Sequence, residues 1–527
     1  MLREADVVLS RAPSSAVVVL EGDKPCMVAA ALVAGHPSAR VTSLPVSPPS
    51  PSLHSRLAAR GPLGLIVVTT DACHQAADLA KIYREVLLQL APGGSLLMAD
   101  VDTERPPGAV VPLIDCLTAV READELAPAD ADEAVLAAAT RRAVINGTGL
   151  TAVNETAALA KLREDEVDFV LSHRGARAGE VLAQIAPETF VPSGANWDYA
   201  AEVKQRDPKP IHVPQLSLRQ YNAAYCLPRQ VTVSGNLLLP DTYRHRPEKR
   251  LKNKGTTELS PLFAQVQSNL DKATTVEGSV FQFDSEWSGH FGHLMTEQLS
   301  RLWAWRQAKS LFPDVRPVIH RNRPTDTVAP WERGLLEAAG IDAGEVLLIT
   351  GAIRADRVIA ATPMFSQPYY VSPQIEGIWN EVGQGAQTIA GDAATPSRIF
   401  VSRRRPARWC HNRDEVEETF AKAGFTVVYP EDLPFAQQTA LFRNAELIAG
   451  FAGSAMFTLN MCDVAKRVLL VCSQGYIPHN EYLIAAARGH RLDIFWSVPD
   501  TPKVNEKFAF DFDREGRHLR RVLNDLH

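Results

Sequence analysis

The chain has 527 residues, of which 46% are hydrophobic and 22% charged, and its formal net charge is -6 at pH 7. A single hydrophobic core stops growing near roughly 250 to 300 residues, so we expect two or three domains. The composition excludes a largely disordered chain, and the charge argues against a general nucleic-acid binder. We find no secretory signal and no apolar run long enough to span a membrane, which predicts a cytoplasmic protein.

The first part of the chain alternates apolar strand-like runs with helical stretches. This pattern is typical of a parallel sheet with crossover helices. It predicts a separate, doubly wound Rossmann-like domain over residues 1–178. We expect helices at 27–34 and 76–90, a Pro-Gly-Gly turn at 92–94, and strands at 16–20, 41–44, 65–70, 95–99 and 167–172.

Residues 79–101 resemble the late helix, Pro-Gly-Gly turn and strand of class I methyltransferases. The cofactor turn of those enzymes needs several glycines, so that the backbone approaches the ligand and leaves its amides free. Here only Gly22 remains, followed by Asp23 and Lys24. We therefore expect a degenerate, inactive methyltransferase-like domain. An active S-adenosylmethionine-dependent methyltransferase with an accessory C-terminal domain is the alternative.

Periodicity fades and prolines accumulate after this domain, which predicts a linker over residues 179–229. Alternation restarts at 230–239, where we expect a strand or a hairpin around Gly235. Strands and helices then alternate almost to the end of the chain. We expect two further α/β segments, 230–395 and 396–527.

Residues 283–305 carry the most informative pattern. At helical spacing, Met295, Leu299 and Leu302 form an apolar stripe, whereas His293, Glu297 and Ser300 lie on the other side. His293 and Glu297 are neighbours at positions i and i+4. A solvated polar face is one interpretation. Aromatic residues and glycines just before the helix favour a site instead, and its candidate members are Asp284, Trp287 and His290.

A second block begins with a predicted strand at 398–402, which ends at Ser402 and is followed by Arg403, Arg404 and Arg405. Ligands of open α/β sheets bind beyond the carboxyl ends of strands, and guanidinium groups suit a diphosphate. A basic loop that pairs with surface acids is the alternative. Asn412 and Glu415 have the spacing of a capping box.

A third block places a predicted strand at 446–449 before a glycine-containing turn and a helix. Backbone amides at the start of a helix have no partner within it, so they are able to bind an anion. The amides concerned are those of Gly453, Ser454 and Ala455.

Together the three blocks resemble glycosyltransferase family 61, which includes capsular-polysaccharide enzymes. The family's Asn-Phe-Gly-His-Trp-Leu-x-Asp/Glu motif appears as residues 290–297, with His290 in place of Asn and Leu294 in place of Trp. Its Ser-Arg strand end matches Ser402-Arg403, and its helix start matches 412–415. Its His-Gly-Ala-x-x-x-Asn block matches 451–460 in part, with Phe451 in place of His.

The resemblance implies a GT-B-like pair of Rossmann-like lobes, an acceptor-side N-lobe at 230–395 and a nucleotide-sugar-side C-lobe at 396–527. It implies an inverting transferase of bacterial polysaccharide biosynthesis that moves a sugar from a nucleotide-sugar to a glycan or other hydroxyl acceptor. It also implies no bound metal, and the sequence agrees, because no Asp-x-Asp loop lies on a plausible strand end of this part. No cofactor is expected, since the nucleotide-sugar is a substrate. A non-catalytic nucleotide- or carbohydrate-binding protein is a further alternative.

The residue roles follow from the same resemblance. The donor would contact Ser402, Arg403, Arg404 and the turn 453–455. We expect Glu297 to be the base that takes the acceptor proton, oriented by His293, and the reversed roles remain open. The residues expected near the acceptor or in the cleft are His290, Trp287 and Asp284.

Overall fold

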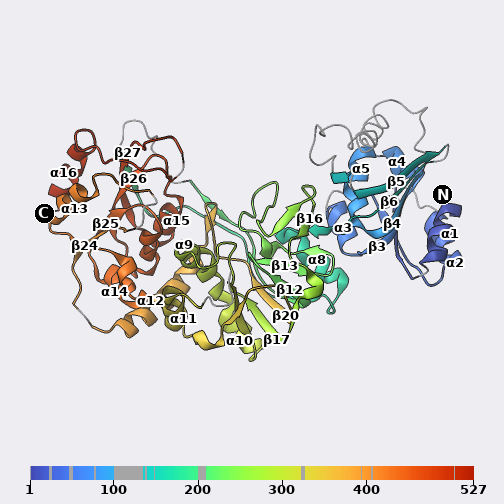
Figure 1. Cartoon of the computed structure of the whole chain (residues 1–527), viewed down its shortest axis with the longest axis horizontal. Coiled ribbons are helices and arrows are strands. Elements are labelled where there is room, and N and C mark those ends of the chain that lie inside the picture. Colours follow the sequence, from blue (N-terminus) through green and yellow to red (C-terminus); the bar gives the residue numbers. More distant parts are fainter. Residues whose placement is uncertain are drawn as a thin grey trace. The chain divides into compact units, whose positions relative to one another are not determined.

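The computed structural model describes residues 2–12, 14–22, 27–46, 51–75, 79–99, 135–136, 139–146, 149–199, 209–321, 327–392, 394–404, 408–503 and 505–526. The chain divides into two compact units. Figure 1 shows the helices and strands, coloured along the sequence. Unit 1 consists of Met1–Leu182, Arg219–Gly278 and Gly351–Val358, and unit 2 of Ala183–Leu218, Ser279–Thr350 and Ile359–His527. Within the described ranges, no helix has both the length and the apolar character that a membrane span requires.

Unit 1 begins with a six-stranded sheet in the order β2-β1-β3-β4-β6-β5. The first four strands pair in parallel, and β6 and β5 are antiparallel. The strands are β1 (Ala16–Glu21), β2 (Arg40–Pro45), β3 (Leu63–Val68), β4 (Leu90–Ala99), β5 (Thr140–Asn146) and β6 (Gly149–Asn154). The helices are α1 (Leu2–Arg11), α2 (Met27–Gly35), α3 (Leu53–Ala58), α4 (Thr70–Gln75), α5 (Leu79–Val86) and η1 (Leu87–Gln89).

These elements confirm the parallel strands expected at the start of the chain. Apolar side chains of β1, β3 and β4 form one core with α1 and α2. The expected helix at 76–90 is shorter, since α5 covers Leu79–Val86, and residues 76–78 lie outside the described part of the chain.

The expected strand at 167–172 is wrong, because this segment lies in helix α8 (Glu164–Arg174). Three acidic residues occupy the first turn, where they interact favourably with the helix dipole. Gly175, with φ of 71°, ends the helix. Val167, Val170 and Leu171 are the buried residues, at helical spacing. This short apolar run therefore has the periodicity of a helix and not that of a strand.

The rest of unit 1 is built on a second, mixed sheet. Both β14 and β16 pair with β7, which groups residues 219–278 with the N-terminal part. The expected hairpin around Gly235 is confirmed, with φ of 57° at that glycine. The elements are β7 (Leu159–Lys161), β8 (Gly179–Ile185), β12 (Leu216–Leu227), β13 (Val231–Ser234), β14 (Leu237–Leu238), η2 (Pro240–Thr242), β15 (Thr256–Glu258), β16 (Phe263–Val266), η3 (Leu270–Lys272), β17 (Thr274–Gln282) and β20 (Ile353–Ala361). The boundary between the units falls inside β8, β12, β17 and β20.

Unit 2 contains a six-stranded parallel sheet in the order β10-β27-β26-β25-β23-β24. An all-parallel sheet of this kind is typical of a Rossmann-like domain. Its aromatic core includes Phe400, Phe420, Phe451, Phe495 and Phe508. The strands are β10 (Asn196–Asp198), β23 (Arg398–Val401), β24 (Thr426–Val428), β25 (Leu447–Phe451), β26 (Arg467–Ser473) and β27 (Arg491–Ser497).

Unit 2 also holds the end of β17, with which β18 pairs in parallel, and β19 pairs in parallel with β18. The short strands are β9 (Glu188–Phe190), β11 (Ile211–Val213), β18 (Arg316–His320), β19 (Leu347–Ile349), β21 (Phe365–Ser366) and β22 (Tyr370–Val371). The helices are α9 (Phe291–His293), η4 (Leu294–Gln298), η5 (Leu299–Ala304), α10 (Trp305–Leu311), α11 (Pro330–Ala338), η6 (Ala343–Glu345), η7 (Pro373–Ile375), α12 (Glu376–Ala390), α13 (Arg413–Lys422), η8 (Pro430–Asp432), α14 (Phe435–Asn444), η9 (Ser454–Met461), α15 (His479–Arg488) and α16 (Gly516–Asn524). Both sets of parallel strands make this unit an α/β fold.

Candidate active site

The helical segment that follows β17 is irregular. It begins as one α-helical turn, continues as the π-helix η4 and the 3-10 helix η5, and returns to α-helix at α10. Thr296 Oγ1 donates to Gly292 O at 2.7 Å and Ser300 Oγ donates to Glu297 O at 3.0 Å. Such side-chain bonds compete with the regular helix ladder, and π-helical turns concentrate at functional sites.

The segment is buried rather than solvated. Every residue from Leu294 to Arg301 is buried, Glu297 and Ser300 included. Gln298 Nε2 donates to Phe283 O at 2.9 Å and Arg301 Nη1 donates to Asp284 O at 2.7 Å, so buried polar side chains fix the helix to the end of β17. The interpretation as a solvated polar face is therefore wrong.

His293 and Glu297 form a hydrogen-bonded pair, as their spacing predicts. His293 Nδ1 lies 3.0 Å from Glu297 Oε2, and the side chains are 14% and 4% exposed. The His293 ring is stacked near Trp287, with centroids 6.0 Å apart and planes at 11°. It meets His290 edge to face at 4.9 Å. Since Glu297 engages Nδ1, Nε2 is the ring nitrogen of His293 that does not bond to Glu297.

The His293–Glu297 pair lies beside two exposed aromatic rings and a capped first helical turn. Trp287 is 38% exposed and His290 is exposed. His290 Nδ1 accepts a hydrogen bond from Gly292 N at 3.2 Å, which caps the first turn. The sequence motif therefore presents two aromatic rings at the surface beside a buried carboxylate.

Gly292 brings this helix against the turn that follows β25. A Cβ atom built on Gly292 would lie 2.7 Å from Ser454 Oγ and 3.1 Å from a ring carbon of Phe457. Asn460 Nδ2 of η9 donates to Met295 O at 2.8 Å, which adds a second link between the same segments. Two blocks far apart in the sequence thus meet, and the absence of a side chain at Gly292 permits the contact.

The turn after β25 has an unusual backbone at Gly453. Its φ is 142°, a conformation that L side chains rarely adopt, and it directly precedes η9. Gly453 N donates to Glu481 Oε1 at 2.7 Å. Within the predicted turn 453–455, the amide of Gly453 is therefore already bonded, whereas the amides of Ser454 and Ala455 lie at the start of η9.

Arg403 lies beside this turn. Its Nη2 donates to Ala452 O at 2.5 Å, and its guanidinium lies 5.8 Å from the Phe451 ring centroid. Burial, with the charge of Arg408, lowers the pKa of Arg403 to about 10. Phe451, which replaces the histidine of the family motif, packs edge to face on Phe400 in the core.

Arg404 and Ser402 have different surroundings. Arg404 is exposed, forms an ion pair with Asp432 at 2.6 Å and lies over the Tyr429 ring. Ser402 is 1% exposed, and its Oγ donates to Glu417. Arg405 lies outside the described residues. The surface pairing of Arg404 agrees with the alternative interpretation of the arginine run.

Asn412 does not form the predicted capping box. Its side chain makes no capping hydrogen bond to the start of α13. Instead, Asn412 Oδ1 accepts from Phe510 N at 2.8 Å and Nδ2 donates to Phe510 O at 2.9 Å. The side-chain amide of Asn412 thus bonds to both backbone groups of Phe510, and these bonds replace the expected capping bond to α13. Gly424, with φ of 83°, follows the end of α13.

Asp284 forms a buried pair with a residue that sequence analysis missed. Its Oδ2 lies 2.7 Å from Nδ1 of His320, the last residue of β18, and His320 N donates to its Oδ1 at 3.2 Å. Burial raises the pKa of Asp284, but His320 and backbone amides outweigh burial and lower it. The motif gave no signal for His320, which lies in an ordinary apolar strand.

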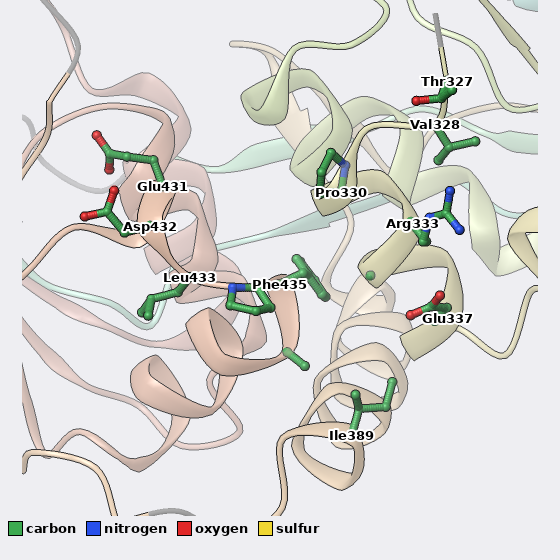
Figure 2. A pocket seen from close by; sticks show the side chains of 13 residues that line it. Thr327, Val328, Pro330, Arg333, Glu337, Ile389, Glu431, Asp432, Leu433 and Phe435 are labelled. Carbon is green, nitrogen blue, oxygen red and sulfur yellow. The ribbon is translucent and has the colours of Figure 1, made fainter.

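A cavity of about 580 Å³ lies beside α11 and η8 (Figure 2). Two of its lining side chains bond to the predicted site residue Arg404: Glu431 Oε1 accepts from Arg404 N at 2.6 Å, and Asp432 forms the ion pair with its guanidinium. The cavity is lined by Thr327, Val328, Pro330, Arg333, Gly334, Glu337, Ile389, Glu431, Asp432, Leu433, Pro434, Phe435 and Ala436.

Comparison with known proteins gives one family match. Residues 291–469 match the model of the family described as Glycosyltransferase 61, which is less than half of the chain. No curated protein matches the chain. Two solved structures of the MycE methyltransferase from the mycinamycin biosynthetic pathway, one with Mg, SAH and mycinamycin VI and one with Mg and SAH in crystal form 2, are 12% and 11% identical. Each alignment covers 29% of this chain and 48% of MycE with a TM-score of 0.24, so the chain spans about half of MycE. Residues 291–469, which hold both the His293–Glu297 pair and the Gly453 turn, are thus similar to glycosyltransferase family 61.

Proposed function

We propose that the chain is a glycosyltransferase that moves a sugar from a nucleotide-sugar donor to a glycan or other hydroxyl acceptor. The observation that carries the proposal is the contact of Gly292 with Ser454, because it places the His293–Glu297 pair next to the turn at Gly453. A glycosyltransferase needs a base for the acceptor and an anion site for the leaving group at such a junction. The match to glycosyltransferase 61 covers both segments.

The geometry favours His293 as the base and Glu297 as the residue that orients it. Glu297 is buried against the ring and engages Nδ1, which holds the tautomer whose Nε2 is an unprotonated acceptor. A carboxylate in this place also stabilises the imidazolium that forms when Nε2 takes a proton. This is the second of the two role assignments that the sequence left open.

The reaction we propose is a single displacement that inverts the anomeric carbon. Nε2 of His293 takes the proton of the acceptor hydroxyl, and the acceptor oxygen forms its bond to the anomeric carbon. The bond from that carbon to the donor phosphate oxygen breaks, and a nucleoside diphosphate leaves with the electron pair. Arg403 and the amides of Ser454 and Ala455 would stabilise its charge.

The two-lobed architecture is part of the same proposal. The parallel sheet that contains β23 and β25 would be the nucleotide-binding lobe, since Arg403 and Gly453 follow the carboxyl ends of these strands. The parallel strands β17, β18 and β19 would belong to the acceptor lobe of a GT-B fold. Trp287 and His290 offer exposed rings on which a sugar acceptor would stack.

The test is donor turnover by purified protein. UDP-, GDP-, TDP- and CMP-sugars are supplied in turn, and release of the free nucleotide is measured with and without EDTA. We expect turnover of one donor class, unchanged by EDTA and lost in His293→Ala. Binding without turnover of any donor would favour a non-catalytic binding protein, and loss of turnover in EDTA would refute the metal-independent mechanism.

A further inference from the structure

A second arginine lies at the turn where we place the donor phosphates. A Cβ atom built on Gly453 would be 2.6 Å from Nη2 of Arg408 and 3.3 Å from Nη2 of Arg403. The two guanidinium groups therefore border the same point. Sequence analysis did not single out Arg408, although it follows closely after the arginine run at Arg403.

The surroundings of Arg408 leave hydrogen-bonding capacity unused. Its Nη1 donates to Asn505 Oδ1, a neutral acceptor, at 2.6 Å, and its guanidinium lies 4.1 Å from the centre of the Tyr476 ring. Its Nε is buried and has no hydrogen-bond partner among the described residues. A buried donor without a partner costs free energy, which a bound anion would recover.

The backbone of Arg408 is also held in a rare conformation. Its φ is 54°, which is uncommon for a residue with a side chain. Strained backbone of this kind costs free energy and concentrates at ligand-binding sites. The strain is consistent with a side chain that must reach a fixed position beside Gly453.

Glu481, the acidic residue next to the turn, does not neutralise Arg403 or Arg408 by an ion pair among the described residues. Glu481 is fully buried, accepts the amide of Gly453 at 2.7 Å and accepts the hydroxyl of Tyr476 at 3.2 Å. Burial raises the pKa of Glu481, which favours its neutral form. Among the described residues, no ion pair joins it to Arg403 or Arg408. Its hydrogen bonds to Gly453 N and to the Tyr476 hydroxyl instead fix the conformation of the turn.

We propose that Arg408, together with Arg403, forms a two-guanidinium site for the diphosphate of the donor, and that Glu481 is the positioning residue of the turn between them. The proposal rests on the glycosyltransferase function proposed above and adds a phosphate ligand to it. Arg403 follows the carboxyl end of β23, Gly453 that of β25 and Tyr476 that of β26, three strands in a row. This is the edge at which parallel sheets bind ligands. Two forked cations suit the two phosphates of a diphosphate.

The experiment measures binding of inorganic pyrophosphate and of UDP, GDP and TDP by calorimetry on the full chain. We expect wild-type protein to bind pyrophosphate more tightly than inorganic phosphate. Arg408→Ala should weaken pyrophosphate binding about 10- to 100-fold, the range of charge-assisted hydrogen bonds. Arg408→Lys should bind pyrophosphate with an affinity between those of wild type and Arg408→Ala, because lysine keeps the charge but lacks the forked donors of the guanidinium group.

Arg306→Ala is the matched control, since Arg306 is an exposed surface arginine of the same unit that pairs with Glu381. Circular dichroism checks the fold of each variant, and Arg408→Lys serves if Arg408→Ala does not fold. Affinity of a folded Arg408 variant within twofold of wild type, or no pyrophosphate binding by wild type, would overturn the site. Pyrophosphate binding that depends on Arg408 in a protein that transfers no sugar would support the site and refute the glycosyltransferase function.

Discussion

His293 Nδ1, at the end of α9, and Glu297 Oε2, on the π-helix η4, lie 3.0 Å apart, and the carboxylate is the more deeply buried partner of the pair. A buried carboxylate that accepts from one imidazole nitrogen fixes which nitrogen carries the proton. The pair is thus pre-organised, because the irregular helix and its side-chain bonds hold both residues before any ligand binds.

Glu297→Gln should lower kcat about 100- to 10,000-fold and leave donor affinity nearly unchanged. General-base catalysis contributes rate factors of this size, and the amide cannot stabilise the imidazolium. His293→Ala should lower the rate at least as much. The measurement is kcat and KM with the donor found active in the nucleotide-release assay. Near-wild-type turnover by Glu297→Gln would remove Glu297 from the mechanism.

Gly292→Ala should reduce turnover and lower the melting temperature. The new methyl group would lie 2.7 Å from Ser454 Oγ and 3.1 Å from a ring carbon of Phe457, so these side chains or the helix itself must shift. Contacts under 3.0 Å of this kind typically cost about 1 to 3 kcal/mol. Gly377→Ala in α12 is the control, since nothing lies within 4 Å of its added Cβ atom.

A double variant tests whether the contact itself causes the effect. Ser454→Gly removes both the oxygen and the Cβ atom that Gly292→Ala would meet, so the two changes together should recover part of the lost stability. Strictly additive destabilisation in this double-mutant cycle would mean that the two residues do not press on each other.

Arg403→Ala should weaken donor binding by about 1.5 to 3 kcal/mol without unfolding the protein. Arg404→Ala should cost clearly less, because Arg404 is exposed and already paired with Asp432. Calorimetric titration with the active donor compares the two. A lower melting temperature for Arg403→Ala with unaltered donor affinity would assign Arg403 a structural role.

The sequence predicted the parts of this fold that depend on local pattern. The strand at Ala16–Glu21 follows from an unbroken apolar run, and the His293–Glu297 pair follows from helical spacing. Contacts between distant segments left no such pattern. Neither Glu481 beneath Gly453 nor His320 beside Asp284 carries a local signal, because each belongs to an ordinary buried element. The error at α8 has the same origin, since a short apolar run fits either period.

The free energy of unfolding should fall as pH drops from about 6.5 to about 4, in part because of His490. Burial lowers the pKa of His490 to about 4, although its bond to Leu459 O acts in the opposite direction. A histidine whose folded pKa lies below its unfolded value stabilises at neutral pH and loses that contribution as pH falls. The shift corresponds to about 3 kcal/mol.

The hydrogen bonds of His490 identify its tautomer and the variant that tests its role. His490 Nδ1 accepts from Lys466 N at 3.0 Å, so protonation there removes the acceptor. The free energy of unfolding, measured with urea across this pH window, should change less with pH for His490→Gln than for wild type. Equal pH dependence in the two proteins would show that other groups control acid unfolding.

The chain should not bind S-adenosylmethionine. The cofactor turn of a methyltransferase would follow β1, where Gly22 is the one glycine. A Cβ atom built on Gly22 would lie 2.0 Å from Oδ2 of Asp71, so the Asp71 side chain, which follows β3, closely approaches this backbone. An anionic side chain at the turn leaves less room for a ligand and repels its carboxylate. Calorimetry with S-adenosylmethionine and S-adenosylhomocysteine should give no binding heat, whereas the active donor should give it on the same sample. Micromolar affinity for either compound would restore methyl transfer as the function of the N-terminal part.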